Sequence, residues 1–220
     1  KIKTPRSEQT NRRKKSAFKC LPKRGVFLSL FLMSILMLAV LTLFGTISGL
    51  LDILHETKFH VLYLLLSLLL LHSFKISPMP EIEINAAVIA LFIVSCIILY
   101  RYKRTVTGIG LILTGCFCIV SAAVTVIAES TELTALLLGI LPALIVLIKR
   151  DHASAIAAAG LIPVVSEMLR ALFEMLNLGY GTVRLGSFTS DVQLLGVLVT
   201  AATAQTLLIL SPNGYGEEKI

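Results

Sequence analysis

Three ionisable residues within one apolar segment have the clearest chemical potential in this sequence. Glu167, Arg170 and Glu174 are spaced at i, i+3 and i+7, so on a helix they lie within an arc of about 60° and can form one ionic stripe. An ionised group near the centre of a bilayer costs about 3 kcal/mol, so Glu167 must be paired, protonated or exposed to water. The stripe is therefore either an ion or proton site centred on Glu167 or, as we expect, a structural ion pair.

A second group, just beyond this segment, combines glycines with one carboxylate: Gly179, Gly181, Gly186 and Asp191. We expect a turn here before the last apolar segment, with the glycines supplying positive φ angles. The tripeptide at 179–181 resembles the Gly-Tyr-Gly of potassium-channel filters. The same tripeptide occurs again at 214–216 in a polar tail, and the residues flanking 179–181 differ from a filter. A channel filter is therefore not expected.

A third group follows the first apolar segment and has metal-ligating residue types: Asp52, His55, Glu56 and His60. On a helix these side chains could share one face and hold a metal. The two histidines are five residues apart, whereas zinc peptidases place theirs four apart. We expect an interfacial polar loop here. No motif in the chain predicts a catalytic residue, a metal site or a cofactor.

Long apolar segments must position these groups. Charged residues make up 15% of the chain and its mean hydropathy is +0.88, whereas soluble domains carry about 25% charged residues. The apolar segments are about 26–45, 59–74, 86–100, 105–128, 133–148, 153–178 and 192–210. A basic tail at 1–25, expected to be disordered, precedes them, and a short polar tail at 211–220 follows. We predict an all-α fold, a polytopic integral membrane bundle of six or seven transmembrane helices.

Basic residues orient such a bundle, and here they leave two solutions. Ten of the twenty Lys and Arg residues fall within Lys1–Arg24, which indicates an anionic membrane surface rather than nucleic acid as the partner of the tail. The tail, Arg101–Arg104 and Lys149–Arg150 all favour the cytoplasm. Three apolar segments separate the tail from Arg101, however. Either Val61–His72 enters the membrane only halfway, leaving six spans, or it crosses as a short helix, giving seven spans with the tail outside.

Several short features occur in a fixed order from Leu64 onward: the basic loop Arg101–Arg104, the acidic turn Glu129–Glu132, Lys149–Arg150, Gly160 with Glu167, and Leu185-Gly186-Ser187 with Asp191. This order resembles that of YphA-like membrane proteins of Gram-positive bacteria, over about two-thirds of the chain. The resemblance implies seven membrane helices and no assigned activity. The long basic tail departs from the pattern.

The sequence thus favours a non-enzymatic membrane component over an enzyme. We expect a multi-pass protein of the bacterial cytoplasmic membrane, structural or accessory, whose partners are the lipid bilayer and a membrane protein or a second copy of itself. The alternative is a small-solute or ion transporter with Glu167 as an intramembrane carboxylate.

Overall fold

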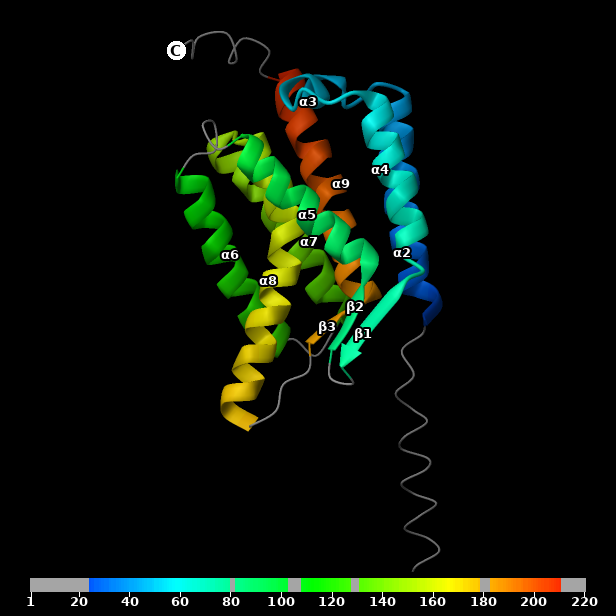
Figure 1. Ribbon diagram of the computed structural model, residues 1–220. Coiled ribbons are helices and arrows are strands. Elements are labelled where there is room, and N and C mark those ends of the chain that lie inside the picture. The colour runs from blue at the N-terminus through cyan, green and yellow to red at the C-terminus, as the bar shows by residue number, and fades with distance from the viewer. Residues whose placement is uncertain (1–23, 80–81, 103–107, 128–130, 179–182, 211–220) are drawn as a thin grey trace, which may run out of the picture.

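The computed structural model describes residues 24–79, 82–102, 108–127, 131–178 and 183–210, and most of these are helical (Figure 1). The elements are α2 (Arg24–Leu43), α3 (Ser48–Ile53), α4 (Lys58–Leu71), β1 (Lys75–Met79), β2 (Ile82–Asn85), α5 (Ala86–Arg101), α6 (Gly108–Ile127), α7 (Thr131–Lys149), α8 (His152–Leu178), β3 (Val183–Leu185) and α9 (Ser187–Leu210). The expected all-α architecture is confirmed as a helical bundle, to which a small sheet is added.

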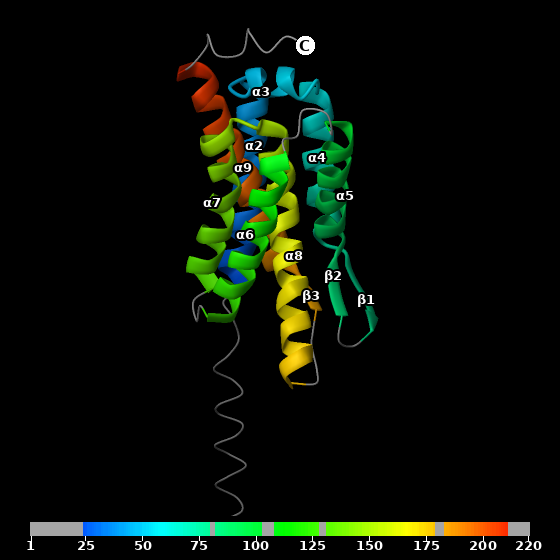
Figure 2. The same cartoon turned by 90° about the vertical axis from the view of Figure 1, so that its left-hand side faces the viewer.

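Seven long helices, α2 and α4 to α9, lie side by side and run between two ends of the bundle (Figures 1 and 2). The short helix α3 lies across one end, called here the α3 end. The sheet lies at the other, called here the sheet end. Helix α8 is the longest, with 27 residues, and its last turns extend beyond its neighbours at the sheet end.

Small residues let α8 pack closely against its neighbours. Its alanines at 155, 157, 158 and 159 are completely buried, and small side chains allow helix backbones to approach one another in such bundles. At the next position, a Cβ atom added to Gly160 would lie 2.0 Å from Ser95 Oγ on α5. On α9, a Cβ atom added to Gly196 would lie 3.4 Å from the Cβ of Ala159. Helix α8 is therefore the centre of the bundle.

Two strands lie between the predicted apolar segments 59–74 and 86–100, and the expected all-α fold did not include them. Strands β1 and β2 pair antiparallel, with Lys75 opposite Asn85 and Ile76 opposite Ile84, and β2 pairs in parallel with β3. Pro78 obscured this hairpin in the sequence. The strand order β1-β2-β3 makes β1 an edge strand, where a proline without an N–H group is tolerated.

The expected turn before the last helix is also shorter than predicted. Helix α9 begins at Ser187 rather than near residue 192, so Asp191 lies in its second turn. Gly186 does not need a positive φ angle, since Gly45 (φ 70°) is the one glycine in that region of φ among the residues described. Gly179 and Gly181 lie outside the described residues. Helix formation from Ser187 accounts for the difference.

Helix α4 runs from α3 to the sheet without turning back (Figure 1). It has 14 residues, a length of about 21 Å. The chain consequently passes along the bundle seven times, and Arg24 and Arg101 lie at opposite ends. The 61–72 segment thus lies almost wholly within the helix α4.

Two described helices are long and apolar enough to cross a membrane, by length and composition alone. They span His152–Asn177, with 26 residues, and Phe188–Leu210, with 23. Five further apolar helices are shorter. These two helices indicate membrane association, and both pack in the centre of the bundle.

Candidate functional site

The ionic stripe on α8 forms as a closed network. Arg170 Nε donates to Glu167 Oε2 at 2.9 Å, Nη2 donates to Glu167 Oε1, and Nη1 donates to Glu174 Oε1. The three side chains are between 16% and 30% exposed. Because Arg170 occupies both oxygens of Glu167, the structural ion pair is the interpretation that the geometry supports.

The stripe lies level with the sheet. The backbone N–H of Arg184, in β3, donates to Glu167 Oε1 at 3.4 Å. The carboxylate of Glu167 therefore contacts both Arg170 on its own helix and strand β3.

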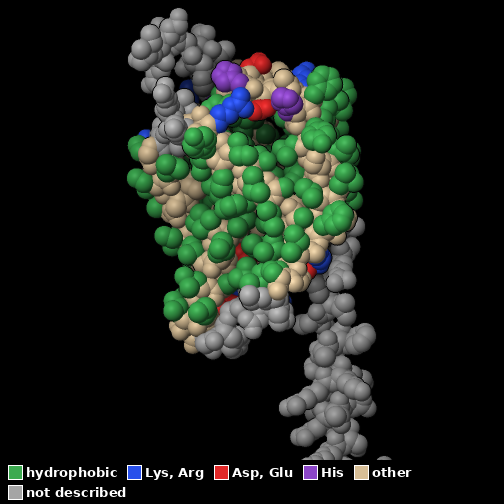
Figure 3. Space-filling model, in the orientation of Figure 1, with side chains coloured by type: hydrophobic (Ala, Val, Ile, Leu, Met, Phe, Trp, Pro, Cys, Tyr) green, Lys and Arg blue, Asp and Glu red, His purple; other side chains and the backbone are tan. Residues whose placement is uncertain are grey.

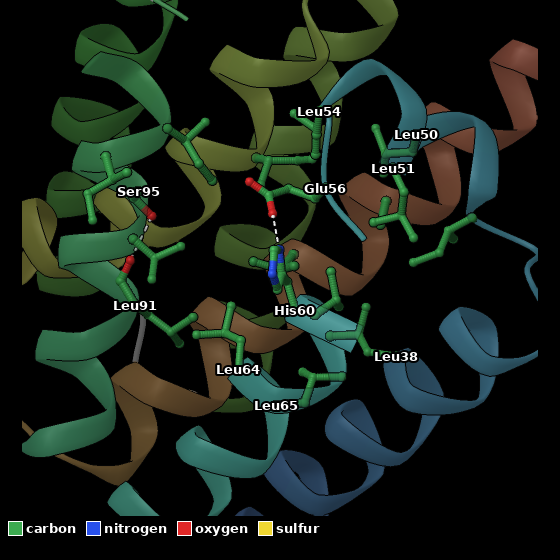
Figure 4. Close-up of a pocket in the computed structure, with 18 of the residues that line it drawn as sticks. Leu38, Leu50, Leu51, Leu54, Glu56, His60, Leu64, Leu65, Leu91 and Ser95 are labelled. Atoms are coloured by element: carbon green, nitrogen blue, oxygen red, sulfur yellow. Dashed lines mark hydrogen bonds and ion pairs between the residues drawn. The ribbon is translucent and has the colours of Figure 1, made fainter. Parts of the chain in front are cut away.

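A cavity lies elsewhere, between α4 and α5. Its volume is about 320 Å³, and its walls are mostly leucine, isoleucine and valine from α2, α3, α4, α5 and α9. Figure 4 shows Leu64 and Leu65 of α4 on one side and Leu91 and Ser95 of α5 on the other. Helices α4 and α5 are close together at the sheet end and diverge toward the α3 end (Figure 1). The cavity fills the space between them.

A small charged cluster surrounds the mouth of this cavity at the α3 end. Glu56 accepts from Arg101 Nη1 through Oε1, and its Oε2 lies 3.2 Å from Nδ1 of His60. The hydroxyl of Tyr102 donates to the carbonyl of Leu54. Figure 3 shows a hollow just below arginine, acidic and histidine side chains at this end. The cavity therefore joins an apolar interior to a charged rim.

Local structure explains how the rim is assembled. The hydroxyl of Thr57 accepts from the N–H of His60 at 3.3 Å and so caps the N-terminus of α4, an arrangement that starts helices favourably. Glu56 and His60 are four residues apart on either side of this cap. Arg101 is the last residue of α5, where a cation complements the helix dipole. Glu56 and His60 are therefore held at the N-terminus of α4, and Arg101 is held at the C-terminus of α5.

Buried polar residues line the inside of the bundle at the sheet end. His72 stacks on Phe31 with ring centroids 3.8 Å apart, and its Nδ1 lies 3.3 Å from Ser190 Oγ. Gln193 Nε2 donates to the carbonyl of Gly160 at 2.7 Å. Asp191 is completely buried, and neither of its oxygens has a hydrogen-bond partner among the residues described. Asp191, predicted as part of a turn, is thus a core residue.

The members of the stripe were predictable from the sequence, but the cavity was not. Of the four polar residues at 52–60, the structure brings Glu56 and His60 together and adds Arg101, which is 45 residues from Glu56. In the described part of the chain, no three His, Cys, Asp or Glu residues are grouped so as to hold a metal. The available signal was the i, i+4 spacing of Glu56 and His60; nothing local indicated Arg101.

Comparisons of the chain with protein-family models, with curated proteins and with solved structures gave no match. The geometry described above is therefore the basis for any statement about function.

Proposed function

We propose that the protein is a multi-pass integral membrane protein whose seven long helices cross the bilayer, and that it is a non-enzymatic structural or accessory component of that membrane. One observation carries the proposal. Large apolar side chains are exposed on every one of the seven long helices, for example Met33 on α2, Ile112 on α6 and Leu172 on α8, at 60%, 67% and 50%. Soluble monomers rarely expose contiguous apolar patches larger than a few hundred Å². Figure 3 shows apolar side chains across the whole middle of one face.

The distribution of charge supports a bilayer around the same middle zone. Lys58, Arg101 and Lys149 lie at helix ends on the α3 side, and Lys75 and Arg184 lie on the sheet side. The charges within the long helices are concentrated in the α8 stripe, which is neutralised in part by its own arginine. Bilayers tolerate ionisable side chains when they are paired or near an interface.

Exposed aromatic residues near the α3 end fit a membrane interface. Phe59, Tyr63 and Tyr100 are 81%, 74% and 75% exposed. Tyrosine is enriched at the level of lipid headgroups, because its ring is apolar and its hydroxyl is polar. The short helix α4, about 21 Å long, is accommodated by local thinning of the bilayer.

The membrane in question, the partner and the non-enzymatic role are proposed mainly from the sequence. The resemblance to YphA-like proteins supports seven helices and the cytoplasmic membrane of a bacterium. A partner membrane protein or a second copy of the chain is proposed to cover part of the apolar surface. The interior polar groups of Asn85, Ser154 and Gln193 serve helix caps and interhelical bonds, which is consistent with a structural role. A transporter coupled through Glu167 is less well supported, because Arg170 holds that carboxylate.

The seven-crossing arrangement is tested by labelling cysteines with a membrane-impermeant maleimide, before and after permeabilising cells. Native Cys20 reports on the tail, and Lys149→Cys in a Cys20→Ser background reports on the end of α7. Five long helices, α2 and α4 to α7, separate these positions, so one cysteine must react in intact cells and the other only after permeabilisation. Reaction of both under the same condition would overturn the arrangement. Native Cys96 and Cys116, exposed on the apolar surface, must remain unlabelled by the charged reagent.

The accessory role is tested separately by mild crosslinking in membranes followed by purification. We expect a crosslinked species that contains a second membrane protein or a second copy of the chain. A chain that is recovered only as an uncrosslinked monomer, under conditions that crosslink a known membrane complex, would contradict the accessory role without affecting the topology.

A further inference from the structure

We propose that the cavity between α4 and α5 binds the apolar chain of a single-chain anionic amphiphile, whose headgroup is held at the mouth by Arg101 and His60. The ligand class is a linear hydrocarbon that ends in a carboxylate or a phosphate. Free fatty acids and single-chain phospholipids share this chemistry. The proposal concerns the cavity alone and does not depend on the number of membrane crossings.

The size and lining of the cavity specify the hydrocarbon part. Its volume of about 320 Å³ is about twice that of an engineered 150 Å³ cavity that stays dry and binds benzene. By that comparison it holds roughly a dozen carbon atoms. The lining is almost wholly aliphatic; the hydroxyl of Ser95, which faces this region (Figure 4), already donates to the carbonyl of Leu91 at 2.9 Å. The site therefore accepts an alkyl chain and offers few partners to polar groups.

The mouth specifies the headgroup. The Glu56 carboxylate lies between Arg101 Nη1 and His60 Nδ1, so a carboxylate of this chain already occupies a position suited to an anionic oxygen. Arg101 is 50% exposed and His60 72% exposed, whereas Glu56 is 33% exposed. The two nitrogen-bearing side chains thus face outward more than the acid does. A guanidinium binds carboxylates and phosphates through two parallel bonds, so an incoming anion competes with Glu56 for Arg101.

The shape of the cavity lets an amphiphile enter from the bilayer. Helices α4 and α5 diverge toward the α3 end, and the charged rim is at that same end (Figures 1 and 4). An alkyl chain that enters between the two helices points toward the sheet end, and its headgroup remains at the level of the rim. Tyr63 and Tyr100, exposed on α4 and α5, lie on helices that border this entrance.

The experiment uses the full-length protein in phosphatidylcholine nanodiscs and a photoactivatable dodecanoic acid that carries a diazirine. We expect crosslinked peptides from α4 and α5, and competition by unlabelled dodecyl phosphate. Dodecyltrimethylammonium, which has the same chain and the opposite charge, must not compete. Stronger competition by dodecanoate than by the phosphate identifies a fatty acid as the source; the reverse order identifies a phospholipid. Equal or better competition by the cation would overturn the proposal.

Two pairs of variants separate the headgroup contact from the cavity. Arg101→Gln should lower capture of the probe about tenfold, the effect of losing one charge-assisted hydrogen bond. Glu56→Gln should raise capture severalfold by removing the competing carboxylate. Leu64→Trp fills the cavity and should abolish capture, whereas Leu66→Trp, at a position 56% exposed on the same helix, should leave it unchanged. Equal capture by the two tryptophan variants, or a lower capture by Glu56→Gln, would refute the site. The capture measured for Arg101→Gln and Glu56→Gln tests the headgroup contact even if Leu64→Trp fails to fold.

Discussion

Replacement of Gly160 by alanine tests the close packing of α8 against α5. A Cβ atom at this position would lie 2.0 Å from Ser95 Oγ, 3.1 Å from Ser95 Cβ and 3.2 Å from the carbonyl oxygen of Leu91. Rotation of the serine hydroxyl can relieve the first contact, but the other two involve atoms fixed to the backbone of α5. Helix α8 cannot simply move away, since the Gly160 carbonyl also accepts from Gln193 on α9 at 2.7 Å.

The expected magnitude is the difference between two effects. Extra atoms in a packed core cost about 1–3 kcal/mol. Alanine in place of glycine within a helix regains about 1 kcal/mol. We expect Gly160→Ala to destabilise the protein by up to about 2 kcal/mol, and in a chain of this size each kcal/mol lowers the melting temperature by about 2–4 °C.

The assay is thermal unfolding of the purified protein in one detergent or bicelle preparation. The matched control is Gly115→Ala on α6, where an added Cβ meets nothing within 4 Å. This control should be neutral or raise the melting temperature. The double variant Gly160→Ala, Ser95→Ala should recover part of the loss, because it removes the shortest of the three contacts. A Gly160→Ala protein at least as stable as Gly115→Ala would refute the close approach of α5 and α8.

Two further predictions concern buried charge. Arg170→Gln should destabilise the protein by about 2–3 kcal/mol in the same assay, since two carboxylates lose a charge-assisted partner. Glu174→Gln leaves the Glu167–Arg170 pair intact and should cost clearly less stability. Equal losses of stability in the two variants would contradict the network. Asp191→Asn should raise the melting temperature at neutral pH, because an ionised carboxylate without hydrogen bonds is costly to bury. A lower melting temperature for Asp191→Asn would refute the inference that this buried carboxylate is destabilising.

The helices were predictable wherever residues within or next to the segment determine its start and its end. The 86–100 segment corresponds to α5 within one residue, because Asn85 caps its start and its apolar residues continue to Arg101. The ionic stripe was predictable for the same reason: residues three and four apart on a helix are neighbours whatever surrounds them. The sheet was not predictable, because β2 pairs with β3, which is about a hundred residues further along the chain. Pro78, in β1, also gave a local signal against a strand.

The cavity could not be inferred because it results from how two neighbouring helices are anchored. Helix α5 is held against α8 where Gly160 meets Ser95, whereas α4 packs on α2, with His72 stacked on Phe31 at its end. The β1–β2 hairpin joins α4 and α5 at the sheet end, so the two helices can separate only toward the α3 end. The α9 wall between them includes small Ala201, which does not fill the space. The Glu56–Arg101 ion pair then joins the segment before α4 to the last residue of α5 at the α3 end, so the space between the two helices is bounded by charge at that end.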